Sequence, residues 1–371
     1  GVPKLDARGR RTEDAYDGQQ RVTAIRYYRN SDNQEYVEDA KYFYYDVQGT
    51  FDSEAWLGRL GRVEYGRVLG GQREFKEKFG YTLAGALKAK EMLVRRQSSG
   101  GTWSYLTLRG TYTHNNEGQL ATVKLPNTST ATGETYTVGR NAMRQANQLT
   151  SSGGVVVAKD AYYGPAGELK EARWLHRIED WGLERWYQEK REYSSRGQLT
   201  KVSWGASDHG WRSIKYRYPV TANAGRLWER ERDGQTVQHS YDVLNRLIRA
   251  ETTSSSWGLK FVHDGFGNRT DQVPTKGGPS WSYVIDPATN RLLGGQQYDA
   301  NGNNTSKPGW GATLGYNSDN RLVSYETPSS GSEYYAYSPF GQMVYRRKVT
   351  TETKEYVAFY GVDGQRVNEY E

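Results

Sequence analysis

One short phrase recurs along this chain, and it limits the possible folds more than any other feature of the sequence. Its clearest copy runs from Tyr241 to Leu247 and reads YDVLNRL. Six more copies follow at intervals of roughly 20 residues, beginning at His263, Ile285, Tyr298, Tyr316, Tyr337 and Tyr360. A short unit repeated at this period predicts an array of small supersecondary units.

Weaker copies of the phrase extend toward the N-terminus. They begin at Tyr45, Tyr112, Tyr163 and Tyr193, and Leu5 to Arg10 reads as a degraded first copy. We therefore interpret residues 1–371 as a single array, with weaker repeats over 1–225 and clear repeats over 226–371.

Each copy has the chemistry of a strand, a tight turn and a second strand. The tyrosine ends the first strand, and the Asp or Asn after it can hydrogen-bond the backbone of the turn. The Gly or Asn four residues after the tyrosine allows a positive φ, and the following Arg-Leu starts the return strand. The residues expected to define the repeats are Tyr45, Asp46, Gly49, Tyr241, Asp242, Asn245, Asp264, Gly267, Tyr298, Asp299, Gly302, Tyr316, Tyr337, Gly341, Tyr360 and Gly364.

One such hairpin is too small to be stable alone, so neighbouring units must pair into a long sheet. The sequence therefore predicts an all-β fold, an array of antiparallel hairpins that forms a curved or spiralling sheet. We expect the aspartates to accept backbone hydrogen bonds at the turns. We expect the repeat tyrosines to pack against the equivalent position of a neighbouring repeat.

The composition supports a folded chain despite its polarity. A mean hydropathy of −0.90 and 42 glycines would by themselves suggest disorder. However, the chain has 30 tyrosines and 11 tryptophans, which bury large areas and keep a polar tip for water. This combination suits a sheet with two partly wet faces. The absence of cysteine excludes disulfides, thiolate metal sites and cysteine nucleophiles.

The charges indicate neither a nucleic-acid surface nor a membrane span. The net charge of +7 comes from 50 basic and 43 acidic residues spread along the chain, whereas nucleic-acid proteins concentrate basic residues on one stripe. No apolar run approaches the roughly 18 residues of a membrane span. The start has no signal-peptide profile, and we expect the sequence to be an excerpt of a longer chain.

The phrase Y-D-x-x-G/N-R-L resembles the signature of the YD-repeat, or Rhs-repeat, family. That family includes bacterial Rhs proteins, the C components of insecticidal toxin complexes, wall-associated contact-toxin proteins and the animal teneurins. The resemblance implies a sheet that spirals into a hollow shell, in a secreted or cell-surface protein. It also implies a partner, either a C-terminal toxin or other cargo that the shell encloses, or further repeats of the same polypeptide.

Two features depart from the encapsulating members of that family. Those members usually carry a closing segment with a DPxG motif and an aspartate self-cleavage site, whereas Asp286 to Thr289 here (DPAT) reads as a turn within a repeat. The chain is also shorter than a typical closed shell, so an open curved sheet is the expectation.

The sequence offers no recognisable catalytic or metal-binding motif. HExxH, GxSxG, Walker and strand-linked GxGxxG patterns do not occur. Asp299 to Asn303 (DANGN) resembles half of a calcium loop, but its glycine is fourth and its twelfth residue is Trp310. We therefore expect no catalytic residue, no metal, no cofactor and no enzymatic activity.

A tryptophan-rich stretch supports two competing functions. The residues concerned are Trp174, Trp181, Trp186, Trp204 and Trp211, with Glu179, Asp180 and Glu184 beside them. Exposed aromatic rings could make the chain a carbohydrate-binding adhesion module, and a carboxylate pair could make it a polysaccharide hydrolase. The simpler interpretation is aromatic packing across strands, and the leading hypothesis remains a structural shell segment.

Two further expectations concern local structure and assembly. Leu83 to Arg96 has helical propensity, yet Tyr81, Gly85 and Leu87 fit the repeat frame and favour a hairpin. Strands near Leu5 and over 360–367 should expose unpaired backbone groups at sheet edges, which recruit other strands. Self-association through such edges is therefore a further hypothesis.

Overall fold

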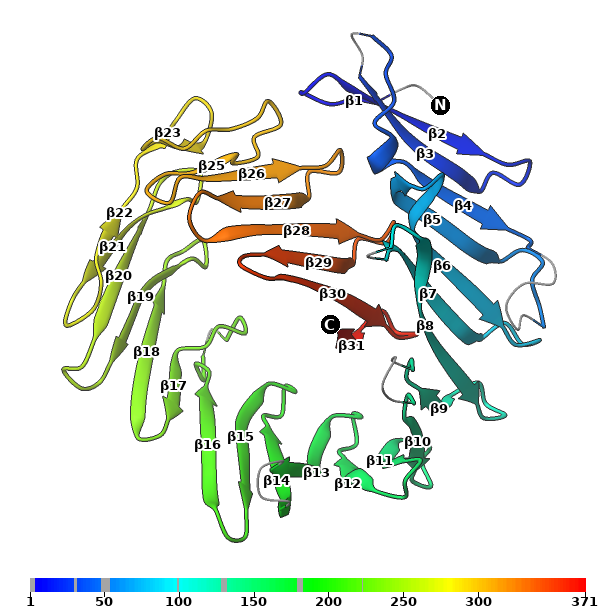
Figure 1. The fold of residues 1–371 in the computed structure, drawn as a ribbon. Helices are drawn as coiled ribbons and strands as arrows, with labels where there is room; N and C mark the ends of the chain where they lie inside the picture. The colour runs from blue at the N-terminus through cyan, green and yellow to red at the C-terminus, as the bar shows by residue number, and fades with distance from the viewer. Residues whose placement is uncertain are drawn as a thin grey trace. The chain divides into compact units, whose positions relative to one another are not determined.

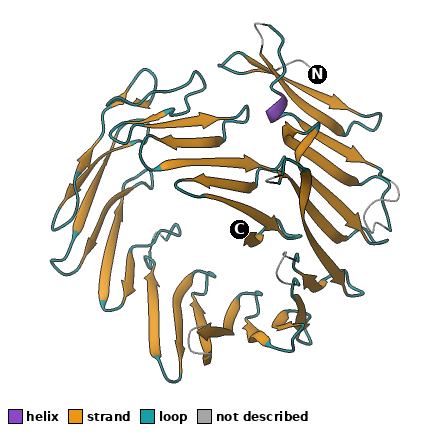
Figure 2. Ribbon diagram, in the orientation of Figure 1, coloured by secondary structure: helices purple, strands orange, loops and turns teal. Residues whose placement is uncertain are grey.

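The fold is almost entirely β-structure, as expected. The computed structural model describes residues 4–29, 32–47, 54–98, 100–127, 132–178, 183–221 and 223–371. Strands make up 58% of these residues, and the helix among them is the short 3-10 turn η1, Val37–Asp39 (Figures 1 and 2). All the strand pairs that the structure describes are antiparallel, which confirms the predicted fold class.

The chain divides into two compact units. The first unit comprises Gly1–Thr135 and Gly295–Glu371, and the second unit comprises Tyr136–Gly294. The interpretation of residues 1–371 as one continuous array stays a prediction.

The first unit contains two series of antiparallel strands. The first series is β1 (Lys4–Leu5), β2 (Arg10–Tyr16), β3 (Val22–Arg29), β4 (Lys41–Tyr45), β5 (Leu60–Leu69), β6 (Gln72–Tyr81), β7 (Leu87–Gln97), β8 (Trp103–His114) and β9 (Leu120–Lys124). The second series is β25 (Ser306–Lys307), β26 (Ala312–Tyr316), β27 (Leu322–Thr327), β28 (Gly331–Tyr337), β29 (Met343–Val349), β30 (Thr353–Tyr360) and β31 (Arg366–Tyr370).

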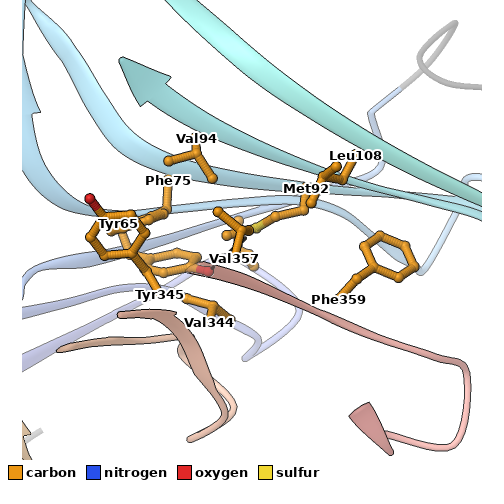
Figure 3. Close-up of a cluster of buried hydrophobic side chains, with 10 residues drawn as sticks. Tyr65, Phe75, Met92, Val94, Leu108, Val344, Tyr345, Val357 and Phe359 are labelled. Atoms are coloured by element: carbon orange, nitrogen blue, oxygen red, sulfur yellow. Dashed lines mark hydrogen bonds between the residues drawn. The ribbon is translucent and has the colours of Figure 1, made fainter. Parts of the chain in front are cut away.

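The two series of the first unit pack face to face on an apolar core (Figure 3). Strands β5 to β8 and strands β29 and β30 supply the buried cluster, which consists of Val63, Tyr65, Phe75, Met92, Val94, Leu108, Val344, Tyr345, Val357 and Phe359. Phe75 is fully buried and stacks on Tyr65, with ring centroids 5.4 Å apart. β7 lies in this layer, so the segment with helical propensity is a strand, as the repeat frame predicted.

A charged pair is buried beside this core. The Lys90 Nζ lies 2.9 Å from the Glu77 Oε2, and Glu77 is 1% exposed. The buried Tyr65 hydroxyl donates a hydrogen bond of 2.7 Å to the Glu77 Oε1. Burial, together with the charge of Glu77, raises the pKa of the Tyr65 phenol, so Tyr65 stays a donor. Both carboxylate oxygens of Glu77 therefore have a cationic or hydroxyl partner, as a buried charge requires.

The second unit is a single series of hairpins. Its strands are β10 (Thr135–Arg140), β11 (Ala146–Ser151), β12 (Val156–Tyr163), β13 (Leu169–Ile178), β14 (Leu183–Tyr193), β15 (Leu199–Ala206), β16 (Gly210–Arg217), β17 (Glu229–Arg232), β18 (Gln235–Tyr241), β19 (Leu247–Thr252), β20 (Gly258–His263), β21 (Arg269–Pro274) and β22 (Trp281–Ser282), followed by the pair β23 (Ile285–Asp286) and β24 (Arg291–Leu292).

The buried side chains of the second unit are mostly small or polar. They are Ser151, Ala172, Ser203, Ala206, Glu229, Val237, Ala250, Thr252, Phe261 and Gln272. All ten members of the apolar cluster described above belong to the first unit. The second unit is therefore a pleated layer that depends on backbone pairing and on contacts between neighbouring hairpins.

Candidate functional site

The YD turns lie at the ends of successive hairpins, and the residue after the tyrosine organises those turns in which it is Asp, Asn or Ser. The Asp242 Oδ1 accepts hydrogen bonds of 2.9 Å from the backbone amides of Leu244 and Arg246. The same carboxyl oxygen of Asp264 bonds the amides two and four residues further on, again at 2.9 Å. Asx turns of this kind hold the backbone where the strand reverses.

These bonds also shift the acidity of the turn carboxylates. Partial desolvation favours the neutral form of Asp242, but hydrogen bonds from the Arg246 backbone and guanidinium outweigh it and lower the pKa of the carboxyl. For Asp264 the largest cause is the hydrogen bond from the Asn268 side-chain amide, and its pKa is lowered too. Both carboxylates are therefore ionised at neutral pH.

Asp299 and Asp46, the other two aspartates predicted at turns, form different sets of hydrogen bonds. The Asp299 Oδ1 accepts from the Asn303 amide at 2.9 Å, and its Oδ2 accepts from the Asn303 side chain and from Arg8. The Asp46 amide donates to the Arg59 carbonyl at 3.1 Å. The connection that begins at Asp46 is therefore longer than the sequence predicted. Gly49 lies outside the described residues.

The fourth position of the turn has a left-handed backbone, which explains its Gly or Asn. The φ values are 66° at Asn245, 91° at Gly267, 89° at Gly302, 88° at Gly341 and 74° at Gly364. A β-branched or bulky side chain would be strained there. Each of these residues follows the aromatic position by four.

The tyrosine that ends the first strand of a hairpin also contacts the preceding hairpin. Its hydroxyl donates to the backbone carbonyl of a residue at the start of the preceding return strand or, for Leu227, two residues before it. We call this bond the tyrosine staple. Examples in the described part of the chain, with O···O distances of 2.7–3.2 Å, are Tyr81 to Leu60, Tyr163 to Ala146, Tyr193 to Leu169, Tyr218 to Leu199, Tyr241 to Leu227 and Tyr360 to Met343.

The residue before that carbonyl often covers the tyrosine ring. The Arg21 guanidinium lies 4.5 Å from the Tyr45 ring centroid, and Arg321 lies 5.3 Å from the Tyr337 ring centroid. Arg226 covers Tyr241 in the same way at 5.7 Å, within the range of a cation–π contact. The Arg-Leu of one repeat therefore holds the tyrosine of the next, and we call this pair of positions the socket.

The socket adds arginine contacts to the expected packing of the tyrosines. Packing of each ring against the equivalent position of a neighbouring repeat stays a prediction, and Tyr45, Tyr241 and Tyr337 lie against arginines of the preceding repeat. Tyr316 pairs with Leu322 across its own turn, and Tyr298 pairs with Asn304. Burial raises the pKa of the Tyr241 phenol, which keeps the hydroxyl protonated as a donor.

A second contact along the turn edge links each socket to the next turn. The Arg321 Nη1 donates to the Gly341 carbonyl at 2.6 Å, and the Gln342 Nε2 donates to the Gly364 carbonyl at 3.1 Å. Arg246 donates likewise to the Asp264 carbonyl at 3.0 Å. The Arg321 side chain thus contacts both the ring of Tyr337 and the turn of the following hairpin.

Sequence reasoning missed some of these positions. Residues 16–22 (YDGQQRV) form a YD turn in which Gln20 takes the left-handed backbone with φ 62°. Tyr218 forms a staple, and the AGRL at 224–227 was the signal that could have revealed it. In the copy assigned to Tyr112, His114 occupies the aromatic position opposite Leu120.

The tryptophan-rich stretch does not form one surface. Across β13 to β16, Trp174 lies opposite Tyr187 and Trp204 lies opposite Glu189, which puts both on one face. Trp186 lies opposite Leu175 and Trp211 opposite Gly205, and the alternation of β14 puts these two on the other face. Trp181, Glu179 and Asp180 lie outside the described residues. The four described tryptophans are therefore divided between the two faces of the sheet, two on each.

Charged residues dominate the face that carries Trp186 and Trp211. Lys159 lies 4.0 Å from the Trp186 ring centroid, and Lys190 lies 5.4 Å from that of Trp211. Across the following strands, Lys201 pairs with Glu192 at 3.0 Å. Opposite charges therefore face each other across neighbouring strands, which gives a solvated face that needs no apolar cover.

Three further features concern metal binding, membrane insertion and a cavity. Within the described ranges, no group of three or more His, Asp or Glu residues could hold a metal ion. The described helix is far too short to cross a bilayer. A cavity of about 690 Å³ lies within the first unit, beside Tyr36, Tyr65, Tyr334 and Tyr345. Its flanking Arg67 and Glu74 pair with each other at 2.6 Å.

Comparison with known proteins supports the fold. No protein-family profile matches the sequence, and no curated protein matches it. Among solved structures, a mutant Photorhabdus luminescens Tc holotoxin pore matches 96% of this chain with a TM-score of 0.74 and 14% identity. A TcdB2–TccC3–Cdc42 crystal structure matches 97% with a TM-score of 0.74 and 13% identity.

A crystal structure of TcdB2–TccC3 without its hypervariable C-terminal region gives a TM-score of 0.74 over 96% of this chain, at 13% identity. This chain spans about a fifth of the length of those chains, since it covers 19%, 20% and 19% of them. The likeness confirms the fold expected from the YD-repeat resemblance.

Proposed function

We propose, on the basis of this YD-repeat fold, that the chain is a structural wall segment of a secreted or cell-surface bacterial protein of the Rhs type. Its role is to enclose, protect or present another polypeptide, such as a toxin. The wall itself carries out no catalysis. The observation that carries the proposal is the fold likeness over 96% of the chain to solved chains of Tc toxin assemblies.

The second unit supports this role through its chemistry. A wall between two aqueous spaces needs two faces that tolerate water, and this unit has a charged face and few large buried side chains. The staples and sockets join hairpin to hairpin without a second layer. A sheet of this kind can be extended by repetition, because each contact involves only neighbouring units.

The test is protection of an enclosed polypeptide in the native protein that contains this chain. We would treat that protein with a broad-specificity protease, with and without prior unfolding in denaturant, and follow the fragments by mass spectrometry. A fragment that resists digestion only while the wall is folded is the expected result. Equal digestion of every polypeptide under both conditions would contradict enclosure. Turnover of a polysaccharide, or specific binding on a glycan array, would point to a hydrolase or an adhesion module.

A further inference from the structure

Polar contacts fasten the N-terminal hairpin of the first unit to turns of the second series of strands. The turn at 6–10, between β1 and β2, meets the turns at 299–303 and 317–321. The Arg8 guanidinium, for example, donates to the Asn317 carbonyl at 2.9 Å, although the two residues lie 309 positions apart. We call these three turns and the contacts between them the clasp.

The clasp lies away from the apolar core of the unit. All ten members of the apolar cluster lie on β5 to β8, β29 and β30, whereas the clasp contacts are hydrogen bonds such as that from Arg10 to the Ser318 hydroxyl at 2.8 Å. Arg10, Asn317 and Asp319 of the clasp also line the cavity of about 690 Å³. Opening of the clasp would therefore release the hairpin and widen access to the cavity without exposing the core.

Asn301 joins all three turns of the clasp. Its Oδ1 accepts a hydrogen bond of 3.1 Å from the Arg8 backbone amide. Its Nδ2 donates to the Asp6 Oδ2 and to the Asn320 Oδ1, each at 2.8 Å. An ionised carboxylate has no proton to donate, so an aspartate at this position could not form the last two bonds.

The charges around Asn301 also favour an amide over a carboxylate. The Arg8 guanidinium already lies 3.3 Å from the Asp6 carboxylate and 3.4 Å from that of Asp299. Burial favours the neutral form of Asp6, but hydrogen bonds from the Arg10 backbone amide and from Asn301 outweigh it and lower the pKa of the carboxyl, so Asp6 is ionised at neutral pH. An acid at position 301 would add a third negative charge to a partly buried place, where solvent screens little.

The residue that follows makes the Asn301 amide chemically labile. Asn301-Gly302 is the single Asn-Gly pair of the sequence, and glycine lets the backbone approach closely because it has no side chain. The Gly302 nitrogen can attack the Asn301 Cγ. The bond from Cγ to Nδ2 then breaks, and ammonia leaves with the proton of the attacking nitrogen. Water opens the resulting cyclic imide to aspartate or isoaspartate.

We propose that Asn301 is a deamidation site that controls the clasp, in which the amide fastens the hairpin and the carboxylate releases it. In the closed clasp the Gly302 N–H donates to the Asp299 carbonyl at 3.0 Å, and partners on both other turns hold the Asn301 side chain. Attack therefore requires an open clasp, and the product then prevents full reclosure. The inference rests on contacts within the first unit and does not depend on the enclosing role.

The first test follows the amide in the unchanged chain. We would incubate the whole chain at mildly alkaline pH, with and without denaturant, and measure conversion of Asn301 by peptide mass spectrometry. Conversion about ten-fold or more faster in denaturant is the expected result, because the folded clasp protects the amide. Equal rates in the two conditions, or no conversion of Asn301 in denaturant, would overturn the proposal.

A second test loosens the clasp without changing the amide. Arg8→Ala removes the bonds to Asp299 and Asn317 and should speed the conversion of Asn301 in the native chain. Arg366→Ala, on β31, should leave that rate unchanged. The same rate of conversion in both variants would contradict control of this amide by the clasp.

The product of the reaction is tested by Asn301→Asp. Amide exchange over residues 4–16 should become about ten-fold or more faster, because two hydrogen bonds are lost and like charges meet, while β5 to β8 keep their protection. The matched control is Asn115→Asp, since the Asn115 Oδ1 only accepts from backbone amides of its own turn, as a carboxylate can. Equal exchange over 4–16 in the two variants would contradict release by the carboxylate.

A double variant tests the pair that faces across the clasp. Asp6→Asn combined with Asn301→Asp again places one amide opposite one carboxylate, with the donor on the other side. It should restore most of the protection over 4–16 that Asn301→Asp alone removes. Protection that stays as low as in the single variant would show that this pair does not hold the clasp closed.

Discussion

The two units of this chain are built from the same hairpin phrase but are stabilised by different interactions. In the first unit two layers enclose an apolar cluster in which Phe75, Val63 and Val357 have no exposure to solvent. In the second unit the side chains that are buried are mainly alanine, serine and threonine. The comparison teaches that the phrase specifies the hairpin and its link to the next hairpin, whereas a second layer is optional.

The first prediction compares the same substitution in both units. Phe75→Ala should lower the free energy of unfolding of the first unit by about 3–5 kcal/mol, because it empties a fully buried site. Phe266→Ala, in a turn of the second unit, should change stability by less than about 0.5 kcal/mol, since Phe266 is 73% exposed. Hydrogen exchange resolved by peptide would report each unit separately. Similar effects of the two substitutions would contradict the proposed difference in stabilisation between the two units.

The second prediction concerns a repeat tyrosine in the unit without a core. Tyr241→Ala removes both the ring under Arg226 and the staple to Leu227, and should cost on the order of 3 kcal/mol. Thermal unfolding followed by circular dichroism would measure this. An unchanged melting temperature would show that the tyrosines are not structural.

The third prediction isolates the staple with two adjacent tyrosines. Tyr163→Phe deletes a hydroxyl that donates to the Ala146 carbonyl at 2.7 Å, and should cost about 1 kcal/mol. Tyr162→Phe on the same strand should cost almost nothing, because that side chain is 64% exposed. Denaturant unfolding of the two variants gives the comparison. If both lose the same stability, the staple adds nothing to the packing of the ring.

The smallest expected effect is the acid sensitivity of the turns. The pKa of the Asp264 carboxyl is lowered in the folded chain, mainly by the Asn268 side-chain amide. A lowered folded pKa means that this stabilisation is present above the ordinary value of 3.8 and is lost as the pH falls through the folded pKa.

The amides of Phe266 and Asn268 should therefore loosen only below about pH 4, as NMR titration would show. Asp264→Asn keeps a side-chain acceptor without the charge, so these amides should then respond little to pH. Loosening of the turn near neutral pH would contradict the assignment of this carboxylate.

The sequence predicted the hairpins better than it predicted the contacts between them. The left-handed positions at Asn245 and Gly267 follow from local backbone sterics, which any single copy of the phrase reveals. The destination of the Tyr241 hydroxyl, the Leu227 carbonyl, depends on which hairpin precedes it and on a bulge at the tyrosine. Periodicity alone does not specify such a bulge.

The residues of the apolar core, and the faces on which the tryptophans lie, could not be predicted from the sequence for a related reason. Phe75 and Tyr345 lie 270 positions apart, and the contact between their rings depends on how two distant series of strands pack. Trp186 and Trp204 fall on opposite faces because strand register fixes the face of each side chain. Closeness in sequence suggested a cluster that the register does not allow.

The measurement that tests the central claim most directly is native-state hydrogen exchange of a four-fold variant. Tyr163→Phe, Tyr193→Phe, Tyr218→Phe and Tyr241→Phe together remove four staples of the second unit and leave every ring in place. We predict that protection of the second-unit strands falls about a hundred-fold or more, while β5 to β8 in the first unit keep their protection. Unchanged exchange in the second unit would contradict the claim that tyrosine staples replace a core there.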